Sequence, residues 1–390
     1  MTALPHQGDG VASSLRILQV TPTYAPEVGG VATCVSEVTR GLVARGVAVD
    51  VLTVDPTGRL SRRETMYGAP VRRVRGWPSG ADYRFAPAIS GQVRHGNCDI
   101  VHVQCYQTLV APIAMLAAAR ARIPYVLTFH GGGHSSRWRH ASRRKQLQVL
   151  RPLLARAARL IATADWEVDY YSTLLELPAE RFVVIPNGGD LPQVPEHATP
   201  ANGTLIVSIG RAERYKGHHR VLAALPGVIR EVPDARLWVA GEGPYAAELA
   251  ALAQTLGISD RVEIRAERDR EQYAALLAGA SLATLLSEFE THPIAALEAI
   301  TLGVPTLVAD NSGLAELAQK GFAHSVPLGD SDAAHARAMV EMIRRPPPPR
   351  PDIVMPTWDQ CVDSLVDLYW SLSGHGAAQH LDHRSARRDA

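Results

Sequence analysis

The chain has 390 residues, enough for two domains with separate hydrophobic cores. Hydrophobic residues make up 46% and charged residues 20%, as in an ordinary soluble globular protein, and the net charge of +1 argues against a dedicated nucleic-acid-binding protein. The four cysteines are scattered without a C-x-x-C pair, which indicates neither a disulfide framework nor a zinc site.

The start of the chain does not resemble a targeting segment. Residues 1–14 lack the basic segment and apolar stretch of a signal peptide, and we expect a disordered tail there. No apolar run approaches the length of a transmembrane helix. These features predict a cytoplasmic protein.

The first predicted strand, residues 15–21, leads into a loop that contains Gly29 and Gly30, and a helix follows over residues 31–45. A strand, a glycine loop and a helix together offer backbone N–H groups to an anion. The G-x-G-x-x-G fingerprint of dinucleotide-binding proteins is absent. From these residues alone, the two glycines fit a tight turn as well as an anion site.

A histidine follows a later strand of the same half. His130 comes directly after a predicted strand and precedes three glycines. A lone histidine is more often structural, but the carboxyl end of a strand in an α/β sheet favours contact with a ligand. The strands predicted in this half after the first one cover residues 47–54, 70–75, 99–103, 124–129, 160–163 and 182–185.

The one strongly basic run, residues 137–145, includes Arg143, Arg144 and Lys145. It is most simply a solvated face of a helix. The alternatives are a binding surface for a phosphorylated acceptor or for an anionic membrane. The predicted helix has apolar residues at helical spacing: Leu147, Leu150, Leu154, Ala157 and Ile161.

The pattern of strands and helices restarts after a linker. Residues 189–203 are rich in Pro, Gly, Thr and Asn, which is typical of an interdomain connection. A strand over residues 204–209 then ends in Gly210 and Arg211, and Lys216 follows before the next helix. Two cations on one short loop at a strand end suit a diphosphate, although either alone could be a solvated surface residue.

Two glutamates follow a later buried strand, residues 282–286. Glu290 lies on the loop after that strand, and a helix is expected from Pro293 to Gly303. Glu298 falls on the apolar face of this helix, where a carboxylate is costly unless something donates a hydrogen bond to it. The donor can be a protein group or the hydroxyls of a ligand. The remaining strands of this half are expected at residues 235–240, 261–265 and 306–309.

The end of the chain contains three further features. Asp330-Ser331-Asp332 forms a D-x-D, which we interpret as a helix cap with aspartate at the helix start rather than as a metal site. The proline-rich residues 344–351 predict a semi-rigid spacer. An amphipathic helix is expected over residues 357–372, and the tail that follows is expected to be disordered.

These motifs together resemble one family. Glu290 and Glu298, seven residues apart and followed by Gly303-Val304-Pro305, match the E-x7-E signature of retaining family-4 glycosyltransferases. The loop from Gly210 to Gly217 matches the family's G-R-x4-K-G, and Pro186-Asn187-Gly188-Gly189-Asp190 matches its P-N-G-x-D turn. The resemblance extends over residues 17–372.

The resemblance implies an α/β fold of GT-B architecture, in which two Rossmann-like βα domains face each other across a cleft. It implies an acceptor-binding domain over residues 15–188 and a nucleotide-sugar donor domain over residues 204–345. Residues 346–372 would form the spacer and a C-terminal helix that crosses back to the N-terminal domain, and the tail would follow over residues 373–390.

The resemblance also implies the reaction and its residues. A sugar would pass from a nucleoside diphosphate sugar, such as a UDP- or GDP-sugar, to an acceptor hydroxyl of a glycan, glycolipid or small molecule, without a metal or further cofactor. Separately from the resemblance, we predict that Arg143, Arg144 and Lys145 serve the acceptor, with peripheral membrane contact as an alternative, because this basic run follows His130 in the first half of the chain whereas Arg211, Lys216 and both glutamates lie in the second. The residues implied to act in catalysis are His130, Arg211, Lys216 and Glu290, and those implied to bind the donor are Gly29, Gly30, Arg211, Lys216, Arg265, Glu290, His292, Pro293, Ile294 and Glu298.

One departure from the family pattern concerns the donor sugar. Thr291-His292-Pro293 stands where the family commonly has two glycines around a phenylalanine. Because Pro293 lacks an N–H group, one donor to the sugar is missing there, and His292 could replace it with its side chain. The alternatives to a transferase are a sugar-nucleotide epimerase and a non-catalytic sugar-nucleotide binder.

Overall fold

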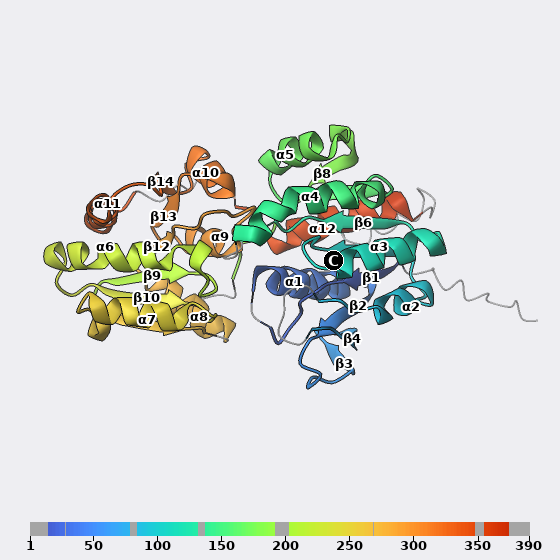
Figure 1. Cartoon of the computed structure of the whole chain (residues 1–390), viewed down its shortest axis with the longest axis horizontal. Helices are drawn as coiled ribbons and strands as arrows, with labels where there is room; N and C mark the ends of the chain where they lie inside the picture. Colours follow the sequence, from blue (N-terminus) through green and yellow to red (C-terminus); the bar gives the residue numbers. More distant parts are fainter. Residues whose placement is uncertain are drawn as a thin grey trace, which may run out of the picture.

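The computed structural model describes residues 15–27, 29–78, 84–131, 137–191, 203–267, 269–347 and 355–373, without the side chains of residues 137–141. They form two α/β domains that lie next to each other along the long axis of the molecule (Figure 1). The expected tail at residues 1–14, all but the first residue of the expected tail at 373–390, most of the linker and residues 348–351 of the proline-rich spacer lie outside the described residues.

The N-terminal domain is built on an eight-stranded sheet in the order β3-β4-β2-β1-β5-β6-β7-β8. All neighbouring strands are parallel except the edge pair β3 and β4. The order reverses between β1 and β5, which are adjacent. The strands are β1 (Arg16–Val20), β2 (Ala48–Asp55), β3 (Arg63–Met66), β4 (Ala69–Arg75), β5 (Ile100–Gln104), β6 (Tyr125–Thr128), β7 (Arg159–Ala162) and β8 (Phe182–Val184).

Helices cover both faces of this sheet, so its central strands are buried on both sides. One face packs against α1 (Gly30–Ala44) together with the C-terminal helix, and the other packs against the remaining helices. Those are α2 (Ala88–Arg94), α3 (Val110–Ala121), α4 (Arg137–Leu154) and α5 (Asp165–Leu175).

The C-terminal domain has a six-stranded, fully parallel sheet in the order β11-β10-β9-β12-β13-β14. This is the strand order of the Rossmann fold, and it reverses between β9 and β12. The strands are β9 (Leu205–Ile209), β10 (Arg236–Ala240), β11 (Val262–Arg265), β12 (Leu282–Leu285), β13 (Thr306–Ala309) and β14 (His324–Val326).

Two apolar clusters fill the space on either side of the C-terminal sheet. Residues of α6 (His218–Glu231), α7 (Ala246–Thr255) and α11 (Asp332–Arg344) belong to one cluster. Residues of α8 (Arg270–Ala278), α9 (Ile294–Thr301) and α10 (Ser312–Gln319) belong to the other.

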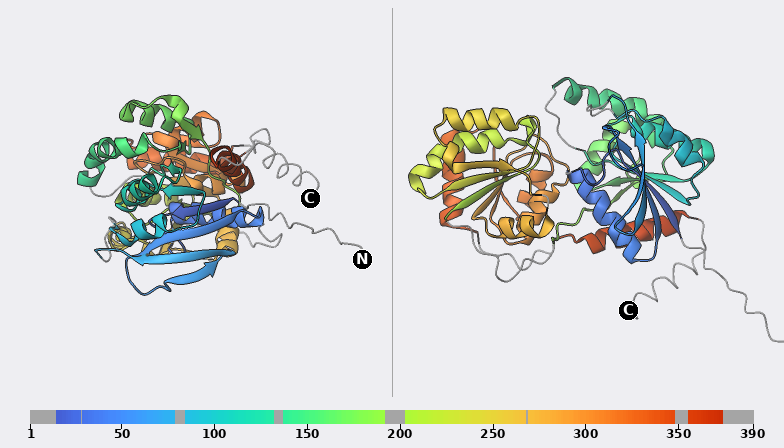
Figure 2. Two further views of the ribbon diagram at one scale, coloured as in Figure 1. Left: turned by 90° about the vertical axis from the view of Figure 1, so that its right-hand side faces the viewer. Right: turned by 90° about the horizontal axis from the view of Figure 1, so that it is seen from below.

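The last helix, α12 (Trp358–Leu372), returns to the N-terminal domain and lies beside α1 (Figure 2). A capping box between Thr357 and Gln360 fixes its start. Arg45, at the end of α1, donates hydrogen bonds to the carboxylates of Asp359 (2.9 Å) and Asp363 (2.7 Å). The GT-B architecture expected from the resemblance, including the helix that crosses back, is therefore confirmed.

The chain passes between the domains at two places that lie side by side. Gly189 N donates to Pro356 O (3.0 Å), and Trp358 N donates to the Asp190 carboxylate (2.6 Å). A Cβ on Gly188 would lie only 2.2 Å from Trp358 N, so only glycine fits at this crossing. These hydrogen bonds and this close contact hold the two crossing segments together.

Several sequence-based expectations need correction. α4 ends at Leu154, and Ile161 belongs to β7, because the apolar spacing continued by chance across the turn between them. The cap of α11 is Ser331, whose hydroxyl accepts from Ala334 N, and Asp332 is the first helical residue. The helix extends to Arg344, which we had placed in the spacer. The elements β3, α2, α5, α7, α8 and β14 were not predicted.

None of the helices in the described part of the chain is both long enough and apolar enough to cross a membrane.

Candidate active site

The predicted site residues gather where the two sheets present the carboxyl ends of their central strands. In the C-terminal sheet the loops of Arg211 and Glu290 follow β9 and β12, the strands between which the strand order reverses, and this is the place where open α/β sheets bind ligands. In the N-terminal sheet the loop of Gly29 follows β1, and His130 follows β6. Gly29, beyond β1, faces Arg211, beyond β9, because a Cβ on the glycine would lie 3.8 Å from the arginine Cδ. The Thr291 hydroxyl donates to Gly131 O (2.7 Å). Loops of both domains therefore form one site.

The loop after β9 is held by a buried histidine that the sequence analysis did not single out. His218 Nε2 lies 3.1 Å from both Gly210 O and Arg211 O, and Nδ1 lies 2.7 Å from Ser208 Oγ. Since two carbonyls can only accept, Nε2 carries the proton and Nδ1 accepts from the serine. Burial, although the carbonyl hydrogen bonds oppose it, lowers the pKa of His218 to about 4.

We expect acid to destabilise the protein partly through His218. Between pH 6.5 and 4 the unfolded chain binds a proton at this residue that the folded protein does not, so stability falls as pH decreases, by about 2 kcal/mol at pH 5. Thermal unfolding of wild type and His218→Gln between pH 8 and 5 tests this. His218→Gln should have a lower melting temperature than wild type at pH 8, but its melting temperature should fall less on acidification.

The exposed His324 provides a control for this experiment. His324→Gln should retain the wild-type dependence of the melting temperature on pH. An unchanged pH dependence in His218→Gln would show that His218 contributes nothing to the acid sensitivity.

The two cations of this loop differ in their surroundings. The Arg211 side chain is half exposed, and its guanidinium lies 3.5 Å from the Glu213 carboxylate and 3.4 Å from Tyr215 OH. Lys216 is largely buried, and its Nζ lies 2.5 Å from Glu290 Oε1. Burial alone would lower the pKa of Lys216, but the Glu290 carboxylate outweighs it and raises the pKa. Lys216 therefore stays charged.

Glu290 is positioned by the beginning of α10. Its backbone N donates to Ser312 Oγ (2.9 Å), and its carbonyl accepts from Gly313 N (2.9 Å). A Cβ on Gly313 would lie 1.8 Å from Thr291 O, so the close approach requires glycine. The backbone of Glu290 is thus held on both its N–H and its carbonyl group while its side chain pairs with Lys216.

The departure from the family pattern at residues 291–294 has a structural role in the described chain. Trp166 Nε1, on α5, donates to Thr291 O (3.2 Å), so this segment joins the two domains. His292 Nδ1 is buried without a hydrogen-bond partner in the described structure, and burial lowers the pKa of His292 to about 4. Pro293 precedes α9 as its cap, and the Ile294 side chain packs into the apolar cluster of α1 and α12.

Glu298 has a protein donor. Its Oε1 accepts from Arg270 Nη1 (2.9 Å), and its side chain is only 4% exposed. Burial raises the pKa of Glu298, and the positive charge of Arg270 opposes that shift. The hydrogen-bond donor to Glu298 is therefore a protein group, Arg270, and not a ligand hydroxyl. Part of the Arg270 side chain remains exposed beside the carboxylate.

Arg265 ends β11 at the same edge of the sheet. Its guanidinium pairs with Glu263 (2.5 Å) and Glu267 (3.0 Å) and lies 5.2 Å from the centre of the Trp238 ring. Trp238 Nε1 donates to Arg265 O (3.0 Å). The backbone at this position is therefore fixed, while the side chain covers an aromatic ring.

His130 is buried at the end of β6, only 9% exposed, and burial lowers its pKa to about 4. It is a neutral imidazole at neutral pH. Its backbone adopts a positive φ of 41°, a conformation that non-glycine residues adopt mainly where surrounding contacts hold it. Gln107 Nε2 donates to the His130 carbonyl (2.9 Å) and supplies one such contact.

The three basic residues assigned to the acceptor lie on α4. Arg144 and Lys145 are exposed and face solvent, whereas Arg143 is half-buried. His134 and the side chains of residues 137–141 lie outside the described part of the structure.

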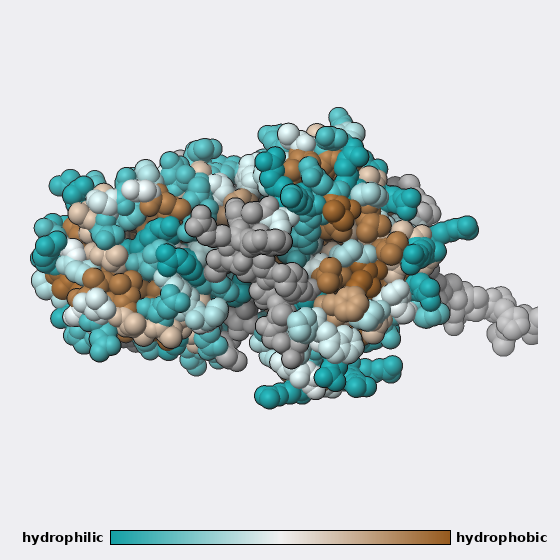
Figure 3. Space-filling model, in the orientation of Figure 1, coloured by the Kyte–Doolittle hydropathy of each residue, from teal (hydrophilic) through white to brown (hydrophobic). Residues whose placement is uncertain are grey.

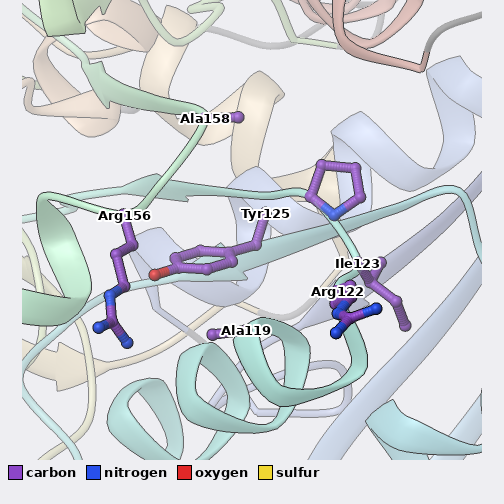
Figure 4. Close-up of a pocket in the computed structure, with 7 residues that line it drawn as sticks. Ala119, Arg122, Ile123, Tyr125, Arg156 and Ala158 are labelled. Carbon is purple, nitrogen blue, oxygen red and sulfur yellow. The ribbon is translucent and has the colours of Figure 1, made fainter.

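A separate pocket of about 370 Å³ lies at the amino-terminal end of β6, opposite the site edge (Figure 4). Arg122 and Arg156 flank Tyr125 in this pocket, and the residues of the candidate site do not line it. Within the described chain, no group of three or more His, Cys, Asp or Glu side chains could hold a metal ion.

Besides His218, three residues at the site were not predicted from the sequence: Arg270, Trp166 and Gln104. Arg270, which pairs with Glu298, gave no signal because it begins a helix that was not predicted. Trp166 likewise lies on an unpredicted helix. Gln104 could have been found, since it ends β5 beside the position where His130 leaves β6.

Two family models match the two halves of the chain. A family model described as "Glycosyl transferase 4-like domain" matches residues 29–188, and one described as "Glycosyl transferases group 1" matches residues 192–350. The GDP-mannose:cellobiosyl-diphosphopolyprenol alpha-mannosyltransferase of Xanthomonas oryzae is 27% identical over 316 residues, covering 78% of this chain and 81% of its own.

Two solved structures share the fold over nearly the whole chain. Sucrose-phosphate synthase from Thermosynechococcus elongatus superposes with a TM-score of 0.69 at 19% identity and covers 96% of this chain and 98% of its own. HepE from Anabaena, solved with UDP and glucose, has a TM-score of 0.68 at 18% identity and covers 95% of this chain and 100% of its own.

Proposed function

Since this chain belongs to the family-4 glycosyltransferases of GT-B architecture, we propose that it transfers a hexosyl group from a nucleoside diphosphate sugar to an acceptor hydroxyl with retention. The observation that carries the proposal is the buried Lys216–Glu290 pair, with Arg211 beside it, facing the Gly29 loop of the other domain. This pair lies where a sugar diphosphate would bridge the two sheets.

The cations suit the leaving group. When the bond between the anomeric carbon and the phosphate oxygen breaks, negative charge grows on the diphosphate, and Arg211 and Lys216 stabilise it as preorganised charges. The amino end of α1 at Gly30 is exposed and offers backbone N–H groups from the opposite domain. The acceptor oxygen bonds to the anomeric carbon, and its proton passes to the departing phosphate, as in the family that this chain resembles.

The remaining donor-binding residues take the roles implied by the resemblance. Glu290 would hold sugar hydroxyls while it keeps Lys216 charged. Glu298 would hold the ribose diol together with Arg270, which is already within hydrogen-bond distance of it. The backbone of Arg265 would lie against the base, and the backbone N–H of Ile294, at the start of α9, would face the phosphates or the sugar.

We assign the acceptor to the N-terminal domain and favour a lipid-linked one. Hydrophobic surface gathers over the helices of this domain in the view of Figure 3, where α3 and α4 lie. Leu109 (42% exposed) and Leu116 (36%) belong to the α3 region and Val149 (77%) to α4, the helix that carries Arg144 and Lys145. Apolar and basic side chains together suit an acceptor with an acyl or polyprenyl chain and a phosphate.

A panel of UDP-, GDP-, ADP- and TDP-sugars, with free nucleoside diphosphate and product followed separately, tests the proposed function. One donor should release nucleotide in step with transfer, the product should keep the donor's anomeric configuration by proton NMR, and turnover should persist in excess EDTA. An epimerised donor without nucleotide release would favour the epimerase. Binding without either product would favour a non-catalytic binder.

We expect the basic residues of α4 to serve the acceptor only. Replacing Arg143, Arg144 and Lys145 together with glutamine should raise the KM for the acceptor and leave the affinity for nucleotide unchanged. The cations expected to bind the diphosphate, Arg211 and Lys216, lie on the loop after β9 (residues 210–217, the phosphate loop) in the other domain. Sedimentation with anionic liposomes at low and high salt measures membrane binding in the same variant. If neither property changes, the basic run is only a solvated helix face.

A further inference from the structure

A continuous network of polar side chains connects the candidate site to the C-terminal helix through the interior of the N-terminal domain. Its members lie on β1, β5, β6 and α12, and each is 9% exposed or less. Buried polar groups are costly unless each has a partner, so such a network fixes the orientation of its members. They are Gln19, His102, Gln104, Thr128, His130 and Tyr369.

The contacts run in sequence from the site inward. His130 Nε2 lies 2.7 Å from Gln104 Oε1, and Gln104 Nε2 lies 2.7 Å from Gln19 Oε1. Gln104 Nε2 also lies 3.2 Å from His102 Nε2. β1 pairs with β5, and β5 pairs with β6. This pairing places Gln19, Gln104 and His130 next to one another across the sheet.

The inner end of the network reaches α12. His102 Nδ1 lies 2.6 Å from Tyr369 OH, and its Nε2 lies 2.7 Å from Thr128 Oγ1. Gln19 Nε2 lies 3.4 Å from the same tyrosine hydroxyl. Every ring nitrogen of His102 and both amide groups therefore have partners within the domain.

These contacts determine which group donates the hydrogen bond between His130 and Gln104. Gln104 uses its amide nitrogen towards Gln19 Oε1, which can only accept, so its amide oxygen faces His130. An amide oxygen accepts a hydrogen bond and cannot donate one. His130 must then carry its proton on Nε2, and Nδ1, which has no hydrogen-bond partner among the described residues, keeps a lone pair.

We propose that Gln104 is a positioning residue that holds His130 as the imidazole protonated on Nε2, so that Nδ1 accepts a hydrogen bond from a hydroxyl of the donor sugar. This assignment of Nδ1 to the sugar rests on the proposed function. Gln107 holds the His130 carbonyl from the same side, so two glutamines that follow one another closely on the chain fix both the ring and the backbone.

The alternative tautomer would present an N–H group instead of a lone pair at the same place. A sugar hydroxyl could still accept from it, but that hydroxyl would then have to find another acceptor for its own proton. Polar groups that orient the imidazole of a metal-binding histidine typically contribute about 10–100-fold to metal affinity or activity, and we take this as the scale for Gln104. Gln104→Met, which keeps the approximate size and removes the amide, should therefore lower kcat by roughly 10–100-fold.

Nitrogen-15 NMR of histidine-labelled protein measures the tautomer directly, without any assay of activity. At pH 7.5 wild-type His130 should show a protonated Nε2 and a bare Nδ1, with the resonance assigned by its loss in His130→Asn. In Gln104→Met the ring should become a mixture of tautomers. A wild-type His130 protonated on Nδ1 would overturn the proposal, and so would a tautomer unchanged in Gln104→Met.

Thr39→Val is a matched control, since it also removes one buried hydrogen bond of the N-terminal domain, from the Thr39 hydroxyl to Val35 O (2.6 Å). It should lower the melting temperature without moving the His130 resonances or kcat. If Gln104→Met does not fold, the wild-type spectrum alone still decides the tautomer.

The kinetic and spectroscopic results separate two kinds of failure. In Gln104→Met, an unchanged affinity for nucleoside diphosphate with a reduced kcat supports the assignment of His130 Nδ1 to the sugar. An unchanged kcat overturns that assignment. If wild type transfers no sugar from any donor, the proposed function fails while the NMR result still decides the role of Gln104.

Discussion

Lys216→Ala is expected to lower turnover by about a hundredfold, because loss of one preorganised donor to a developing oxyanion typically has that effect. Nζ of Lys216 lies 2.5 Å from the Glu290 carboxylate in a largely buried ion pair, which keeps the positive charge at one place. The measurement is kcat with saturating donor.

The same substitution should also reduce stability. Both side chains of the Lys216–Glu290 pair are 16% exposed or less, so removing the lysine leaves a largely buried carboxylate without its partner, at a cost of about 3 kcal/mol. Adding Glu290→Ala should recover part of the melting temperature but none of the turnover. Lys320→Ala is the matched control, since Lys320 also lies 2.5 Å from a glutamate but is half exposed. Wild-type turnover in Lys216→Ala would contradict the phosphate-loop assignment.

Arg211→Ala is expected to lower turnover by a similar factor, about a hundredfold, with almost no change in stability. Its side chain is half exposed, and exposed ion pairs contribute less than about 1 kcal/mol. The affinity for free nucleoside diphosphate should fall as well, because the guanidinium can bind two phosphate oxygens at once. Calorimetry with UDP and GDP together with steady-state kinetics measures both effects.

Two further variants make this test specific. Arg211→Lys should restore only part of the activity, since lysine supplies a point charge without the planar fork of donors. Arg236→Ala removes an exposed arginine at the start of β10, the opposite edge of the sheet, and should behave as wild type. Equal loss in Arg236→Ala would indicate a general effect of net charge instead of a phosphate site.

The fold could be predicted largely because each central strand is a short apolar run with a marked end. The loops that carry Gly29, His130, Arg211 and Glu290 follow such strands, and parallel strands bring their carboxyl ends to one edge. The edge strand β3 gave no such signal, because RETM is polar, mostly exposed and paired on one side only. The missed helices α2, α5, α7 and α8 have only 7 to 11 residues, so each offers few turns in which a helical spacing of apolar residues can be recognised.

The partners of the site residues could not be predicted, since they depend on side-chain packing between distant segments. Lys216 and Glu290 are 74 residues apart, and nothing in either segment indicates that they pair. The position of Glu298 predicted that it needs a donor, but not that Arg270 supplies it. The network behind His130 joins residues on four elements, and the one at its inner end, Tyr369, reaches the N-terminal sheet only because α12 crosses back.

The pinned crossings of the chain at Gly189 and Trp358 have a mechanical consequence. Two bodies joined at two neighbouring points can rotate about the line through those points, but they resist sliding past each other. A sugar nucleotide would therefore enter and leave by a swinging motion of one domain about this axis. Gly29 and Arg211 would separate and meet again along an arc, so that each closure returns them to the same alignment.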